Sequence, residues 1–126
     1  MKYIITILLT TLTISTVAKA ENAMDLSNQI NDLWVSSLGP INHSGIKIGD
    51  IDMAIDYLND ALVLADKISP VTDLPLRQFN FLRILNSLSS LSACEEMKPH
   101  MKEIPQELID EGVHMLELGC PGITNS

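Results

Sequence analysis

The stretch that decides the fold is Leu74–Leu91, LPLRQFNFLRILNSLSSL. Its apolar residues recur every three or four positions, which places them on one wide face of an α-helix. Pro75 stands in the predicted first turn, where its missing N–H costs nothing, and Thr72 or Asp73 is the expected N-cap. We therefore predict that this helix is the centre of a helical core. Its apolar arc consists of Phe81, Leu82, Ile84, Leu85, Leu88 and Leu91.

The opposite face of the same helix is polar but almost uncharged. Such a face can meet another protein without the desolvation of many charges, although a solvated surface is the simpler expectation. The face carries Asn80, Arg83, Asn86, Ser87 and Ser90.

Two further amphipathic helices are predicted before the central one. The first covers about residues 25–38, and Gly39-Pro40 is expected to end it. The second begins at Asp50 as N-cap and ends at Ser69-Pro70, because proline disfavours helix in the residue before it. Residues 41–48 are expected to form an irregular loop between them.

The second predicted helix has a strongly acidic face. Asp52, Asp56 and Asp60 lie four residues apart, so they share one side of the helix and repel one another. A basic partner would relieve that repulsion, and a plain solvated face is the alternative. The segment is like a calcium loop only in composition, because the glycine and terminal glutamate of such a loop are absent. If the protein has a basic protein partner, these three carboxylates are the predicted binding residues.

The segment from Glu95 to Ile104 is charged and is broken by Pro99, which predicts a connection rather than a helix. A fourth helix then opens at Ile104-Pro105 and is expected to end at Gly119. The connection is long enough, when extended, to run back beside the central helix. The last two helices are therefore expected to lie nearly parallel.

Cys94 and Cys120 are the two cysteines of the chain, and such a pair in an exported protein predicts one disulfide. The bridge would close a loop of roughly 25 residues, which is worth about 3–4 kcal/mol in the chain-entropy view. The absence of a Cys-x-x-Cys motif gives little support to a redox or thiolate metal site. The predicted fold is all-α, a small four-helix bundle with one disulfide, after a cleaved signal peptide.

The N-terminal segment is typical of a signal peptide. Lys2 precedes an apolar run, and Ala18-Lys19-Ala20 fits the small-x-small site, so cleavage is expected before Glu21. The run is short for a bilayer span, so stable membrane insertion is not expected. The predicted organisation is a signal peptide over residues 1–20 and a single helical domain over residues 21–126, located in the periplasm or secreted.

The predicted mature domain is strongly acidic. It keeps all sixteen Asp and Glu residues but loses Lys2 and Lys19 from the eight Lys and Arg residues, which gives a net charge of −10. This charge argues against binding to nucleic acid and against adsorption to anionic lipid. A basic protein partner is compatible with it.

Two other binding chemistries stay open. Met97, His100 and Met101 combine thioethers with an imidazole, which suit Cu(I), and they are weak candidates for a soft-metal site. His114 lies among carboxylates at helical neighbour spacing, which favours its protonation in mild acid. A pH-responsive periplasmic chaperone is the functional alternative that this suggests, and an ordinary surface histidine is the simpler one.

Catalytic motifs are lacking in the sequence. No serine stands in a Gly-x-Ser-x-Gly elbow, and few aromatic residues are present to line a substrate cleft. We therefore expect neither an enzyme nor a cofactor. The expected function is that of a small exported helical protein that binds another envelope or secreted protein, as toxin-neutralising immunity proteins and adaptors do.

Overall fold

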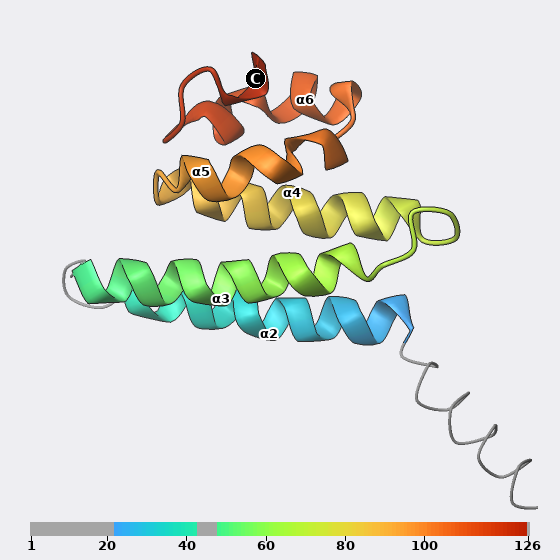
Figure 1. Cartoon of the computed structure of the whole chain (residues 1–126), viewed down its shortest axis with the longest axis horizontal. Helices are drawn as coiled ribbons and strands as arrows, with labels where there is room; N and C mark the ends of the chain where they lie inside the picture. Colours follow the sequence, from blue (N-terminus) through green and yellow to red (C-terminus); the bar gives the residue numbers. More distant parts are fainter. Residues whose placement is uncertain (1–21, 43–47, 126) are drawn as a thin grey trace, which may run out of the picture.

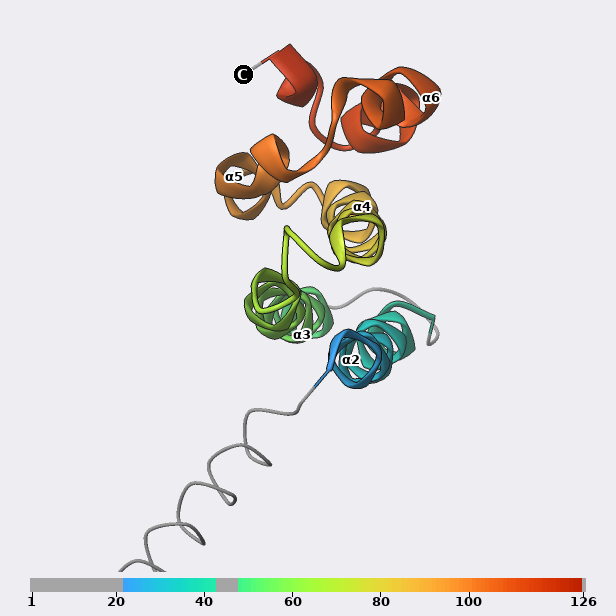
Figure 2. The ribbon, with the colours of Figure 1, turned by 90° about the vertical axis from the view of Figure 1, so that its right-hand side faces the viewer.

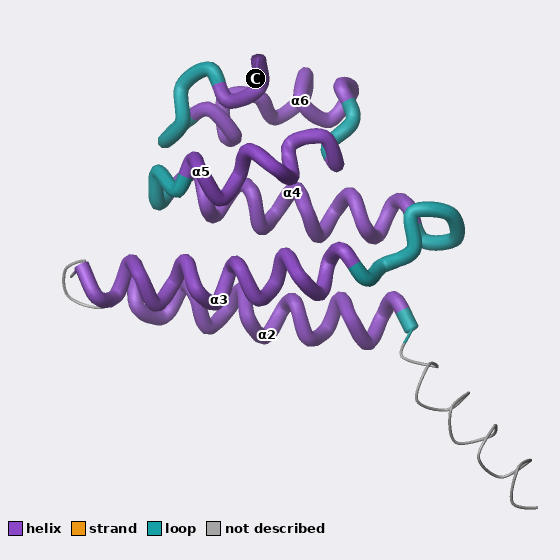
Figure 3. Tube along the Cα trace, in the orientation of Figure 1, coloured by secondary structure: helices purple, strands orange, loops and turns teal. Residues whose placement is uncertain are grey.

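The computed structural model describes residues 22–42 and 48–125. These residues form helices joined by short turns, with no strand among them (Figure 3). The predicted all-α class is confirmed. In chain order the elements are α2 (Ala23–Asn42), α3 (Ile48–Asp66), α4 (Leu74–Ser90), α5 (Cys94–Met97), the 3₁₀ helix η1 (Lys98–Glu103), α6 (Gln106–Glu117) and the 3₁₀ turn η2 (Ile123–Asn125).

The helices stack in two layers around α4 (Figures 1 and 2). Helices α2, α4 and α6 lie in one layer, and α3 and the α5–η1 segment lie in the other. Helix α4 contacts α2, α3, α5, η1 and α6, so it is the central helix, as the sequence predicts. The molecule is thus a compact helical stack in which α4 has neighbours on both sides.

The core forms where the apolar faces of these helices meet. On α4, Phe81, Ile84, Leu85 and Leu88 have no exposed surface, and burial of a large apolar side chain contributes about 1.5–3 kcal/mol. The other buried apolar residues include Leu26 and Ile30 of α2, Ala54, Leu58, Ala61, Leu62 and Ala65 of α3, and Ile109 and Leu116 of α6.

The predicted disulfide between Cys94 and Cys120 is present, and its two Cα atoms lie 5.7 Å apart. It joins the start of α5, just after α4, to the turn that follows α6. Figure 1 shows that α4 and α6 run in the same direction, and that the segment between them runs back alongside α4. The nearly parallel arrangement expected from the sequence is confirmed.

The first two helices differ from prediction at their ends. Helix α2 continues through Gly39-Pro40 to Asn42, because a proline in the last turn removes only one backbone hydrogen bond. Helix α3 begins at Ile48, so Asp50 is its third residue rather than its N-cap.

The prediction that the connection from Glu95 to Ile104 is not helical is wrong, because α5 and η1 occupy this segment. Met97, Met101 and Ile104 lie at helical spacing and are buried against the core. Pro99 is in the first turn of η1, where no backbone donor is needed. Burial of one apolar face therefore keeps the segment helical despite the proline.

The predicted signal peptide (residues 1–20), its cleavage before Glu21 and the middle of the 41–48 loop lie outside the described residues and stay predictions. Within residues 22–42 and 48–125, no helix is both long enough and apolar enough to cross a membrane.

Candidate functional site

The predicted acidic strip lies on the outer face of α3. Asp52, Asp56 and Asp60 are all exposed, whereas Ala54 and Leu58, on the opposite side of the helix, are completely buried. The helical period of 3.6 residues produces this division. The name α3 acidic strip is used below for the three aspartates.

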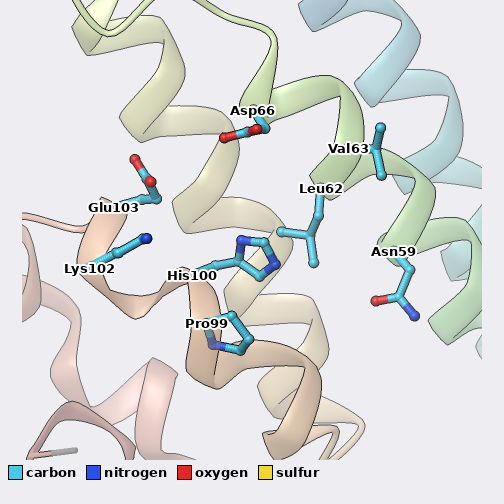
Figure 4. A pocket seen from close by; sticks show the side chains of 8 residues that line it. All are labelled: Asn59, Leu62, Val63, Asp66, Pro99, His100, Lys102 and Glu103. Carbon is cyan, nitrogen blue, oxygen red and sulfur yellow. The ribbon is translucent and has the colours of Figure 1, made fainter.

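A pocket of about 400 Å³ lies beside the strip, between α3 and η1 (Figure 4). Asn59 and Val63 line it and continue the line of Asp52 and Asp56 along α3, at spacings of three and four residues. The α3 acidic strip and this α3–η1 pocket therefore form one continuous surface. The remaining lining residues are Leu62, Asp66, Pro99, His100, Lys102 and Glu103.

The two carboxylates of the pocket are held by one buried arginine from α4. The Nε of Arg77 lies 3.2 Å from Oε1 of Glu103, and its Nη2 lies 3.0 Å from Oδ1 of Asp66. Burial lowers the pKa of Arg77, but the bonds to Glu103 and Asp66 outweigh that effect and raise it. Each carboxylate uses one oxygen for Arg77, so its second oxygen can accept a bond from a ligand.

Arg77 also fixes the end of α3. Its Nη1 donates to the carbonyl oxygens of Ala65, Asp66 and Ile68, at 3.3, 2.8 and 2.7 Å. Ala65 and Asp66 belong to the last turn of α3 and Ile68 follows it, and carbonyls at a helix end lack the usual partner four residues on. This capping explains why α3 ends at Asp66, before the predicted end at Ser69-Pro70.

His100 forms the inner wall of the pocket, where Figure 4 shows its ring next to Leu62. The imidazole stacks on Phe81 with ring centroids 5.8 Å apart. Burial lowers the pKa of His100; Asp66 and Glu103 act in the opposite direction, and Lys102 adds to the lowering. The neutral imidazole is therefore the favoured form in this apolar setting.

The chemistry of the pocket suits a long basic side chain. Leu62, Val63 and Pro99 supply apolar surface for a methylene stem, and the carboxylates at one end can accept from its charged head. Lys102 adds one positive charge at the same rim. The α3 acidic strip extends the negative charge along α3.

The two thioethers among the weak soft-metal candidates are buried. Met97 is completely buried and Met101 is nearly so, and both belong to the hydrophobic core, while His100 lies against Phe81. Among the described residues, no group of three or more His, Cys, Asp or Glu side chains is placed to hold a metal ion. The side chain of His114, the candidate pH-responsive residue, lies outside the described part of the chain.

Sequence reasoning missed Arg77 as an organising residue. Arg77 precedes Phe81 by four positions, so the helical period that predicts the core face also places Arg77 on it. An arginine on an apolar face requires acceptors, and Asp66 and Glu103 are the charged ones. That pattern could have marked Arg77 as a buried residue in need of acceptors, although it does not say which carboxylates supply them.

The polar face of α4 is not the solvated surface that we expected. Asn80 has no exposed surface, and its buried amide is satisfied by donating to Leu76 O at 2.9 Å and to Ser27 Oγ at 3.2 Å. Ser87 accepts a hydrogen bond of 2.7 Å from Nε1 of Trp34. Helix α2 therefore covers part of this face.

The fold and the site together define a small all-α, disulfide-bonded domain with an acidic surface and an adjoining pocket. Comparisons with protein-family models, with curated proteins and with solved structures find no match to this chain.

Proposed function

We propose that this protein is an exported, non-enzymatic binding protein that recognises a basic segment of another envelope or secreted protein. The observation that carries the proposal is the continuity of the α3 acidic strip with the α3–η1 pocket. Three exposed carboxylates lead along one helix face to a pocket with an apolar wall and a carboxylate rim. The compartment is part of the proposal, and the disulfide is compatible with an oxidising one.

Each part of the surface has a separate role in this proposal. The exposed aspartates attract a basic partner and speed encounter, since rim charges act mostly on the association rate. The pocket receives one lysine or arginine side chain and slows dissociation, because a charged head that is desolvated beside carboxylates contributes more than an exposed one. Salt should therefore weaken binding mainly by slowing association.

The test uses three purified forms of the mature domain as baits for envelope and secreted fractions. The first is the wild type, and the second carries Asp52→Lys, Asp56→Lys and Asp60→Lys. The third is a matched control with the same charge change on another helix, Glu107→Lys, Asp110→Lys and Glu111→Lys, since these residues are also exposed.

We expect the wild type and the α6 control to retain the same protein, and the α3 variant to lose it. The affinity for the retained protein should also fall as salt is raised. Equal retention by all three forms would exclude the α3 acidic strip as the recognition surface. Circular dichroism and melting of each form show whether the helical fold is intact.

A further inference from the structure

Arg83 of α4 is a half-buried cation that forms no ion pair with any carboxylate of residues 22–42 and 48–125. Its guanidinium donates to three neutral oxygens: Asn31 Oδ1 at 3.1 Å, Ser27 O at 3.3 Å and Asn80 Oδ1 at 2.8 Å. Every ion pair recorded among residues 22–42 and 48–125 involves other cations. Burial lowers the pKa of Arg83. Its charge is therefore partly desolvated, and no anion in the described part of the chain pairs with it.

The surroundings of Arg83 compensate this charge only in part. The guanidinium carbon lies 5.8 Å from the ring centroid of Trp34 and 5.2 Å from that of Phe79, and such cation–π contacts are favourable. However, Nε of Arg83 and Oδ1 of Asn86 are buried and have no hydrogen-bond partner. Buried polar atoms without partners are rare in proteins, so these two atoms call for an explanation.

A groove of about 310 Å³ opens beside Arg83, between α2 and α6 and over α4. These three helices make up the layer opposite α3 and α5 in Figure 2. Met115 of α6 is 48% exposed and forms an apolar wall opposite Trp34 of α2. The polar residues of the groove are Arg83, Asn86, Ser87 and Ser90.

We propose that this α2–α4–α6 groove binds a carboxylate carried on a short apolar chain, as at the C-terminal leucine of a peptide. The carboxylate supplies the anion that Arg83 lacks, and the apolar chain lies between Trp34 and Met115. The cavity is at the small end of the range for ligand pockets, which suits one terminal residue. This site is independent of the α3 acidic strip, because it lies in the other layer. It is proposed to bind an anion, whereas the strip is proposed to bind a basic segment.

Trp34 gives a direct signal for the test, because it is the only tryptophan of the chain and lines the groove. The probes are N-acetyl-leucine, octanoate and the uncharged N-acetyl-leucine amide, each titrated into the mature protein while tryptophan fluorescence is recorded. We expect a saturable change with a carboxylate probe and none with the amide. Binding of N-acetyl-leucine alone points to a peptide terminus, and binding of octanoate alone points to a fatty acid.

Variants separate the role of Arg83 from a general loss of charge. Arg83→Gln should weaken carboxylate binding at least about tenfold, whereas Lys98→Gln, at a cation paired on the surface with Glu95, should leave it unchanged. Met115→Glu places a negative charge at the groove without touching the bonds of Arg83, so it tests the proposal even if Arg83→Gln unfolds the domain.

Three results would overturn the proposal. They are no saturable fluorescence change with either carboxylate, an equal response to the amide, and carboxylate binding that survives Met115→Glu unchanged.

Discussion

Arg77 links three parts of the molecule through one guanidinium, at the centre of the candidate site. Its side chain is 7% exposed, while those of its ion-pair partners Asp66 and Glu103 are 71% and 22% exposed. The bond to Asp66 is therefore screened by water, and the bonds to Glu103 and to the α3 carbonyls are the stronger ones. Loss of this side chain would leave buried acceptors without a donor.

We accordingly expect Arg77→Met to destabilise the domain by about 1–3 kcal/mol, the cost of leaving buried acceptors without a donor. Urea unfolding followed by circular dichroism measures the change. Lys98→Met is the control, because it removes an exposed pair that contributes at most about 1 kcal/mol. Similar losses in both variants would show that the Arg77 network does not support the fold.

His100 gives stability a predictable dependence on pH. Its pKa in the folded protein lies below the ordinary value of 6.5, so the unfolded chain binds more protons as the pH falls through 6.5. Folding stability should therefore decrease on acidification in this range. His100→Phe keeps a ring against Phe81 but does not titrate, so the wild type should lose more stability than this variant between pH 7.5 and pH 5. A wild type that gains stability relative to the variant on acidification would contradict the neutral, buried imidazole.

At the scale of elements, the docking of α6 on α4 depends on the backbone around Gly119. Ser89 of α4 donates to Leu116 O at 2.7 Å and accepts from the Gly119 amide at 3.1 Å. A Cβ at position 119 would overlap the carbonyl oxygen of Ser89. This close approach, rather than the end of a helix, requires glycine here, since α6 already ends at Glu117.

We expect Gly119→Ala to lower the free energy of unfolding by about 1–3 kcal/mol, as overpacking does. Gly122→Ala is a matched control, because Gly122 has a φ of +81° but open space around it, and the cost there is confined to about 1–2 kcal/mol of backbone strain. Thermal melting compares the two variants. A smaller effect at position 119 than at position 122 would indicate that α6 can move away from α4.

The elements also differ in how far their sequence predicts them. The long helices with regular apolar spacing, above all α4, are predictable because the helical period and burial agree. The α5–η1 segment was missed because Pro99 and the surrounding charges concealed the buried positions Met97, Met101 and Ile104. The exposed aspartates of the site follow from the period alone, whereas Arg77 and Glu103 meet across 26 residues of sequence, which no local pattern reveals.

At the scale of the whole molecule, the disulfide closes the half of the stack that lies beyond α4. Cys94 and Cys120 are separated by 26 residues, so Cys94→Ser should cost about 3–4 kcal/mol. Melting of the variant and a thiol titration of the denatured, non-reduced wild type test this together. Free thiols in the wild type, or an unchanged melting temperature in the variant, would show that the bridge does not stabilise the domain.

The two layers give the molecule two different faces. The layer of α3 and η1 presents the α3 acidic strip beside a pocket, and the layer of α2, α4 and α6 presents a groove with a cation. A partner that is bound through the proposed function should therefore touch only the first layer.

The most direct test of the central claim is the footprint of the retained partner on the ¹⁵N-labelled mature domain, mapped by NMR chemical-shift changes. We predict that the largest changes occur along α3 from Asp52 to Asp66 and in η1, with α6 unaffected. Changes confined to α2 and α6, with the α3 amides unmoved, would contradict the assignment of the α3 acidic strip and its pocket as the binding surface.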